Sequence, residues 1–182
     1  MKNYFIIHAM GNKANDYWYP WLKEQINKQG FNCYVPTMPN LKNSSYEQWE
    51  KEFKKISNNL NKDSVVIGHS TGSIFLAHYI ISNKINVKKF IGVVSFNEPD
   101  GQGIHDDLDK INMSFFINNL QDLKIYAEER VCFYSPTDLY DYNKLDDFAN
   151  KVEAKKVIIQ NAGHFTATTG YGKRFEEILK YL

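Results

Sequence analysis

The chain has 182 residues, of which 43% are hydrophobic and 24% charged, which is enough apolar material for one packed core. Its 22 Lys and Arg residues nearly balance 21 Asp and Glu residues, which argues against a nucleic-acid-binding surface. No apolar run reaches the roughly 18 to 20 residues that span a bilayer, and the amino terminus lacks a signal-peptide pattern. We therefore expect one domain over residues 1–182, in the cytoplasm and away from membranes.

Six short apolar runs have the length and composition of buried strands. They are residues 4–7, 33–35, 64–67, 90–94, 131–134 and 157–159. Their nearly continuous hydrophobicity indicates burial on both faces of a sheet. Cys33 and Cys132 lie within two of these runs, so we expect buried thiols and neither a disulfide scaffold nor a four-thiolate zinc site.

Helical patterns separate these runs. The first covers residues 16–29 and ends at Gly30, and the second is an apolar stripe over residues 46–60. Ser45 and Gln48 predict a capping box at the start of the second helix. A further helix follows residue 72, and the last is expected over residues 172–182. This alternation predicts a mostly parallel sheet with helices on both faces, a three-layer α/β/α sandwich.

The segment Gly68-His69-Ser70-Thr71-Gly72 directly follows a buried run and precedes a helical pattern. G-x-S-x-G in this setting is typical of a nucleophile elbow, in which a strand turns abruptly into a helix and exposes one hydroxyl. Glycines at both ends remove side chains that would clash in the turn. Ser70 is therefore the candidate nucleophile.

A serine hydroxyl needs an imidazole to accept its proton, and the imidazole needs a carboxylate to hold its tautomer. In hydrolases with this elbow the chain order is serine, acid, histidine. Asp138 follows the fifth predicted strand and His164 follows the sixth, so both fit this order. Asp141 lies three residues from Asp138 and is the alternative acid.

Acyl transfer also needs amide donors for the oxygen of the tetrahedral intermediate. One donor is expected from the backbone of Thr71, directly after the nucleophile, and the second from the backbone of Met10 in the loop after the first strand.

The remaining polar residues favour plainer interpretations. His69 occupies the variable elbow position, His78 lies on the following helix and His105 lies in a polar stretch. No metal-ligand spacing is present, and the acidic residues Asp106, Asp107 and Asp109 favour a solvated helix start.

These features together resemble the α/β-hydrolases, and more narrowly the small serine hydrolases related to retinoblastoma-binding protein 9. The resemblance rests on Trp49 and on residues 8–11, 18–22, 35–39, 68–72 and 162–165, which span nearly the whole chain. It implies a shortened core of six parallel strands in spatial order 2-1-3-4-5-6 and a triad of Ser70, Asp138 and His164. The chain departs from the family pattern at Ala9, where glycine is usual, and at Leu139, where proline usually follows the acid.

The sequence thus predicts a carboxylesterase-like serine hydrolase that cleaves small esters, or amides, through an acyl-enzyme on Ser70, with no cofactor. Residues 95–130 are expected to overhang the site, with Phe96, Phe116 and Phe165 lining a small pocket. One alternative is a non-catalytic module that keeps this fold and binds a ligand or a protein. A second is a nucleotide-binding protein, which the missing glycine-rich phosphate loop disfavours.

Overall fold

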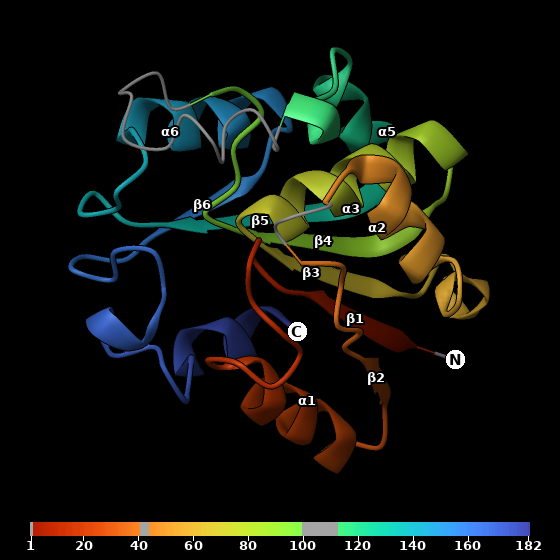
Figure 1. Ribbon diagram of the computed structural model, residues 1–182, viewed down its shortest axis with the longest axis horizontal. Helices are drawn as coiled ribbons and strands as arrows, with labels where there is room; N and C mark the ends of the chain where they lie inside the picture. The colour runs from red at the N-terminus through yellow and green to blue at the C-terminus, as the bar shows by residue number, and fades with distance from the viewer. Residues whose placement is uncertain (1, 41–43, 100–112) are drawn as a thin grey trace.

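A six-stranded parallel sheet forms the centre of the computed structural model, which describes residues 2–40, 44–99 and 113–182 (Figure 1). Its strands are β1 (Asn3–Ile7), β2 (Asn32–Tyr34), β3 (Val65–His69), β4 (Val87–Val93), β5 (Ala127–Tyr134) and β6 (Lys155–Ile158). Every neighbouring pair is parallel, in the order β2-β1-β3-β4-β5-β6. The predicted sheet and strand order are confirmed.

Helices cover both faces of the sheet, which confirms the predicted three-layer architecture (Figure 1). On one face lie α1 (Tyr19–Lys28) and the 3₁₀ segment η6 (Glu176–Tyr181). On the other lie α2 (Tyr46–Phe53), α3 (Thr71–Asn83), α5 (Leu123–Tyr126) and α6 (Tyr142–Lys151). The remaining 3₁₀ turns are η2 (Ser57–Asn59), η3 (Met113–Phe115), η4 (Leu120–Asp122) and η5 (Ala167–Thr169).

The most buried helix is α3, in which ten residues lie in the core. It contacts β3 on one side and α2 and α5 on the other. A helix that is apolar all round is stable only when its neighbours enclose it. This enclosure holds the amino terminus of α3, and with it the turn from β3, in one place.

Strands β4 and β5 begin earlier than the apolar runs predict, at Val87 and Ala127. The residues that follow these two starts carry charges that pair across the strands, as Lys89 Nζ does with Glu129 Oε2 at 3.1 Å. Cross-strand ion pairs let polar residues continue a parallel ladder at its exposed end. A reading of hydrophobicity alone therefore misses these strand starts.

Three helix predictions need correction. Helix α2 ends at Phe53, and the expected capping box is absent because Ser45 Oγ donates to the Glu47 carboxylate at 2.6 Å. The last segment is the 3₁₀ turn η6, shorter than the predicted helix over residues 172–182. Helix α1 starts at Tyr19, since Asp16 instead accepts a hydrogen bond from the Lys13 amide in the preceding turn.

Helix α6 is absent from the sequence prediction. Its buried stripe consists of Leu145, Phe148 and Ala149, and the Asp141 side chain caps its start by accepting from the Asn143 amide at 2.9 Å. Among the described residues, no helix is both long enough and apolar enough to cross a bilayer.

Candidate active site

Ser70 lies in the abrupt turn between β3 and α3, with φ of 54° and ψ of −123°. An L-residue rarely adopts this positive φ, so the turn holds Ser70 in a strained conformation. A Cβ on Gly68 would lie 2.4 Å from the Ser73 backbone, and one on Gly72 would lie 2.4 Å from the Ile7 carbonyl oxygen. The two glycines of the motif are therefore required by close backbone contacts, as its spacing predicts.

Hydrogen bonds fix the backbone of this turn. The Ser70 amide donates to the Val93 carbonyl of the next strand at 2.8 Å, and Ser73 Oγ donates to the Gly68 carbonyl at 2.7 Å. Thr71 is the first residue of α3, where backbone N–H groups carry partial positive charge. Ser70 is 7% exposed, so its hydroxyl sits in a mostly enclosed position beside that helix end.

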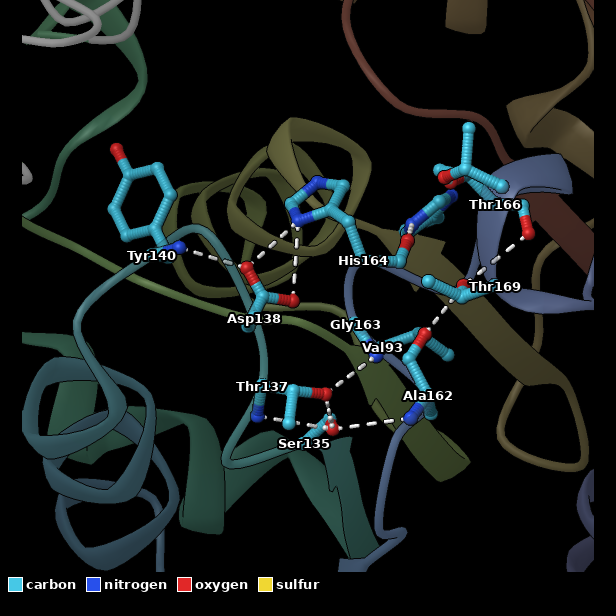
Figure 2. A network of polar contacts seen from close by, with 12 residues as sticks. Val93, Ser135, Thr137, Asp138, Tyr140, Ala162, Gly163, His164, Thr166 and Thr169 are labelled. Atoms are coloured by element: carbon cyan, nitrogen blue, oxygen red, sulfur yellow. Dashed lines mark hydrogen bonds and ion pairs between the residues drawn. The ribbon is translucent and has the colours of Figure 1, made fainter.

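Asp138 and His164 come together from the loops after β5 and β6 (Figure 2). His164 Nδ1 lies 3.0 Å from Asp138 Oδ1 and 3.2 Å from Oδ2. The Asp138 side chain is fully buried, and its Oδ1 also accepts from the Tyr140 amide at 2.8 Å. A carboxylate at Nδ1 keeps the proton there and leaves Nε2 as the basic nitrogen. Asp141, the alternative acid, caps α6 instead.

Two hydroxyl side chains join the Asp138 loop to the His164 loop (Figure 2). Ser135 Oγ accepts from the Ala162 amide at 3.2 Å, and Thr137 Oγ1 accepts from the Gly163 amide at 3.3 Å. Ser135 Oγ and Thr137 Oγ1 also lie 3.0 Å apart and share a hydrogen bond. Sequence reasoning missed these residues, although hydroxyl side chains directly before a candidate acid are a usable signal.

The loop after β1 is held at Ala9. Its amide donates to the Tyr19 hydroxyl at 3.2 Å, and its carbonyl accepts from His8 Nδ1 at 2.8 Å. His8 Nε2 accepts from the Met38 amide at 2.8 Å, so this buried imidazole is neutral, and burial lowers its pKa. Among the described residues, none accepts a hydrogen bond from the Met10 amide, which leaves that N–H available to a ligand.

His69 is also buried and bound at both nitrogens. Its Nδ1 lies 2.7 Å from the Tyr19 hydroxyl, and its Nε2 lies 2.9 Å from the His164 carbonyl oxygen. The pKa of His69 is lowered well below its usual value, first by burial and then by the nearby His164 ring. The sequence analysis assigned no role to this position, because the elbow motif leaves it variable.

A cavity of about 320 Å³ connects these elements. Ser70, Thr71, Met10 and His164 all line it, together with Ala9, Gly11, Asn12, Tyr17, Phe96, Leu139, Tyr140 and Thr166. This is within the usual size range of a small-ligand site. The described lining contains no Asp, Glu, Lys or Arg side chain.

The pocket prediction is right only for Phe96, whose ring stacks on Tyr140 with centroids 4.1 Å apart. Phe116 lies behind Phe96, with ring centroids 6.2 Å apart, and does not line the cavity. Phe165 is fully buried and packs on Phe175, because its position after His164 turns it into the core.

The other candidate residues have structural surroundings. His78 stacks on Tyr46, and its Nδ1 donates to the Phe115 carbonyl at 3.0 Å. Burial raises the pKa of both cysteine thiols to about 12, which confirms the prediction of buried thiols at Cys33 and Cys132. The described residues contain no group of three or more potential metal ligands. His105, Asp106, Asp107 and Asp109 lie outside the described residues, as do residues 100–112 of the expected overhang.

The fold and the elbow place this protein among the α/β-hydrolases. A family model described as "Serine hydrolase" matches residues 4–182, so the chain belongs to the serine hydrolase family. The predicted resemblance to the small serine hydrolases is thereby confirmed.

Individual relatives agree with this assignment. The YdeN protein of Bacillus subtilis (strain 168) is 22% identical over 175 residues, which cover 93% of this chain and 89% of that protein. Its crystal structure aligns with a TM-score of 0.87 at 20% identity, over 100% of this chain and 96% of that one.

Two esterase structures share the fold at greater distance. A carboxylesterase of Nitrososphaera gargenis aligns with a TM-score of 0.73 at 12% identity, over 98% of this chain and 89% of that one. Est1E of Butyrivibrio proteoclasticus, solved with ferulic acid bound, aligns with a TM-score of 0.68 at 15% identity, over 99% of this chain and 89% of that one.

Proposed function

We propose that this serine hydrolase cleaves small, uncharged carboxylic esters through an acyl-enzyme on Ser70, with His164 as general base and Asp138 as the acid that orients it. One observation carries the proposal: His164, whose ring is bound by the buried Asp138 carboxylate, lines the same cavity as the elbow serine, at the carboxyl edge of the sheet. This edge is where parallel α/β sheets bind their ligands.

The first half of the reaction forms the acyl-enzyme. His164 Nε2 takes the Ser70 proton as Oγ attacks the ester carbonyl, and Asp138 stabilises the imidazolium that results. The tetrahedral oxyanion accepts hydrogen bonds from the Met10 and Thr71 amides, each of which contributes about 3 to 4 kcal/mol in comparable sites. The imidazolium then gives its proton to the leaving alkoxide, which departs as an alcohol.

The second half releases the acid. His164, neutral again, takes a proton from a water molecule as that water attacks the acyl carbonyl, and the same amides hold the second oxyanion. Collapse returns the proton to Ser70 Oγ and frees the carboxylic acid.

The cavity lining favours a small apolar substrate. Met10, Tyr17, Phe96 and Leu139 supply apolar surface around the hydroxyl, and a volume of about 320 Å³ is at the small end for ligand sites. A charged acyl group would lose hydration here without gaining an opposite charge from any described lining residue.

A fluorophosphonate probe and nitrophenyl esters test the proposal. We expect the wild type to be labelled and to hydrolyse p-nitrophenyl acetate and butyrate, while Ser70→Ala loses both activities and keeps its melting temperature within a few degrees. p-Nitrophenyl succinate, of similar size but charged, serves as the matched substrate and should react at least about tenfold more slowly.

Two results would overturn this function. Retained hydrolysis in Ser70→Ala would exclude Ser70 as the nucleophile. A folded wild type that takes no label and hydrolyses none of the esters would instead favour the alternative, a binding module with the hydrolase fold. An amide panel run beside the esters decides whether the site also cleaves amides.

A further inference from the structure

A line of hydrogen bonds runs from the loop after β1, through the elbow, to the loop that carries His164. The Ala9 amide donates to the Tyr19 hydroxyl at 3.2 Å. That hydroxyl lies 2.7 Å from His69 Nδ1, and His69 Nε2 lies 2.9 Å from the His164 carbonyl oxygen. Three segments far apart in the sequence therefore meet on one imidazole, next to the candidate nucleophile.

The chemistry of the end groups sets the direction of these bonds. A carbonyl oxygen can only accept, so His69 Nε2 must carry a proton and donate to His164. In the neutral ring Nδ1 is then the acceptor, and the Tyr19 hydroxyl donates to it. The Tyr19 oxygen keeps a lone pair for the Ala9 amide. Each donor thus has an acceptor, in one continuous direction.

The surroundings of His69 favour this neutral form. The ring is fully buried, and its titratable neighbours are His8, His164, Tyr17 and Tyr19, none of which is an acid that would hold a positive imidazolium. Burial lowers the pKa of His69 and raises the pKa of Tyr19, so both groups stay uncharged in the neutral pH range.

A second bond holds the residue after His164. Trp18 Nε1 donates to the Phe165 carbonyl at 3.2 Å, and Phe165 has a φ of 52°, which bulky L-residues rarely adopt. Two successive carbonyl groups of the histidine loop are thus bound by His69 and Trp18. Asp138 binds the His164 ring, and Ser135 and Thr137 bind the two amides before it. His69 and Trp18 add the support at His164 itself and at the residue after it.

We infer that His69 is a positioning residue for His164 and that Tyr19 fixes the tautomer of His69. One buried imidazole then holds the backbone of the general base and, through Tyr19, the loop after β1. This inference rests on the proposed function of the site. His69 does not touch the reacting atoms; it acts through the His164 main chain. Displacing a catalytic group by about 1 Å costs on the order of 100-fold in rate.

Kinetics of four variants test the inference. His69→Phe keeps a ring and removes both hydrogen bonds, and we expect kcat to fall on the order of 100-fold with little change in KM. His69→Gln retains a donor near the Nε2 position and should recover most of that loss. Tyr19→Phe should lower kcat on the order of tenfold. Tyr4→Phe removes another buried tyrosine hydroxyl, at the far end of β1, and should leave kcat unchanged.

Nuclear magnetic resonance supplies a readout that needs no turnover. In the resting wild type we expect His69 to be neutral and protonated at Nε2 between pH 6 and 8. The Nδ1 proton of His164, which reports the hydrogen bond to Asp138, should move upfield and exchange faster in His69→Phe and Tyr19→Phe, but not in Tyr4→Phe.

The two assays separate the inference from the function on which it rests. If the wild type neither reacts with the fluorophosphonate probe nor hydrolyses the nitrophenyl esters, the proposed function fails. The His164 resonance still decides whether His69 positions that ring. If the wild type is active, unchanged kcat and an unchanged His164 resonance in His69→Phe and Tyr19→Phe would leave His69 a packing residue. A charged or Nδ1-protonated His69 would also overturn the inference. If His69→Phe fails to fold, the comparison of Tyr19→Phe with Tyr4→Phe carries the test.

Discussion

The site is held in two different ways on its two sides. At the elbow, backbone packs directly on backbone: a Cβ at residue 72 would lie 2.4 Å from the Ile7 oxygen, and Ser70 is forced to a φ of 54°. Between the loops after β5 and β6, hydroxyl side chains bind backbone amides, and the Asp138 carboxylate binds the His164 ring. The nucleophile is thus placed chiefly by close backbone contacts and the base chiefly by side-chain hydrogen bonds.

This difference predicts different failures. A side chain added at the elbow meets rigid backbone that cannot move without displacing β1, so we expect it mainly to lower the stability of the fold. A substitution in the hydrogen-bonded loops can be accommodated by local movement of the loops, so we expect it mainly to alter the position of the His164 ring. The variants below separate the two sides.

The largest expected effect belongs to the hydrogen-bonded side. Asp138→Asn replaces the acceptor at His164 Nδ1 and favours the wrong tautomer, so kcat/KM should fall on the order of 10⁴-fold with the fold intact. Asp141→Asn keeps a capping side chain on α6 and should lose less than about threefold. Ester hydrolysis by both variants measures the contrast, and the opposite ranking would transfer the acid role to Asp141.

On the elbow side, Gly72→Ala should impair folding itself. The added methyl group lies 2.4 Å from the Ile7 oxygen and 2.7 Å from the His8 oxygen, so we expect a loss of at least about 3 kcal/mol in unfolding free energy. Gly30→Ala is the matched control: its Cβ would meet no atom within 4 Å, and only its φ of +83° costs about 1 kcal/mol. Urea denaturation distinguishes them, and equal losses would contradict the packing account.

A smaller effect is expected at Ser135, which joins the two loops. Ser135→Ala leaves the Ala162 and Thr137 amides without their acceptor, which should cost about 1 to 3 kcal/mol of stability and about tenfold in kcat. Ser57→Ala removes an exposed hydroxyl on η2, so it should change the unfolding free energy by no more than about 0.5 kcal/mol and leave kcat close to the wild-type value. Wild-type kcat in Ser135→Ala would mean that the base is held by other contacts.

The smallest expected effect is a gain in stability. Ser70→Gly relieves the positive φ at the elbow, so it should be more stable than Ser70→Ala by about 1 kcal/mol, a rise in Tm of about 2 to 4 °C. Both variants should fail to react with the fluorophosphonate. Equal melting temperatures would show that the turn stores no strain at this residue.

Local patterns in the sequence predicted the parallel sheet and the elbow, whereas the strand order was implied by the family resemblance. Continuous apolar runs identify strands, and glycines at fixed spacing identify a turn that only they can make. The position of the last loop likewise brought His164 to the right edge of the sheet. These features need no knowledge of distant contacts.

The supports of the site could not be predicted in this way. His69 binds Tyr19, 50 positions earlier, and His164, 95 positions later, and no local pattern records such pairs. Helix α6 was missed because Asp141 was considered as an acid rather than as a cap. Phe165 was expected in the pocket, although the left-handed backbone at this residue turns its ring into the core.

The two cysteines make oxidation a reporter of unfolding. Cys33 lies in β2 and Cys132 in β5, four strands apart, so roughly 19 Å separates them across the sheet, far beyond the about 7 Å that a disulfide allows. With both thiols protonated and enclosed, the native chain should resist air and iodoacetamide alike. An intramolecular crosslink on a non-reducing gel would then mark molecules that have opened.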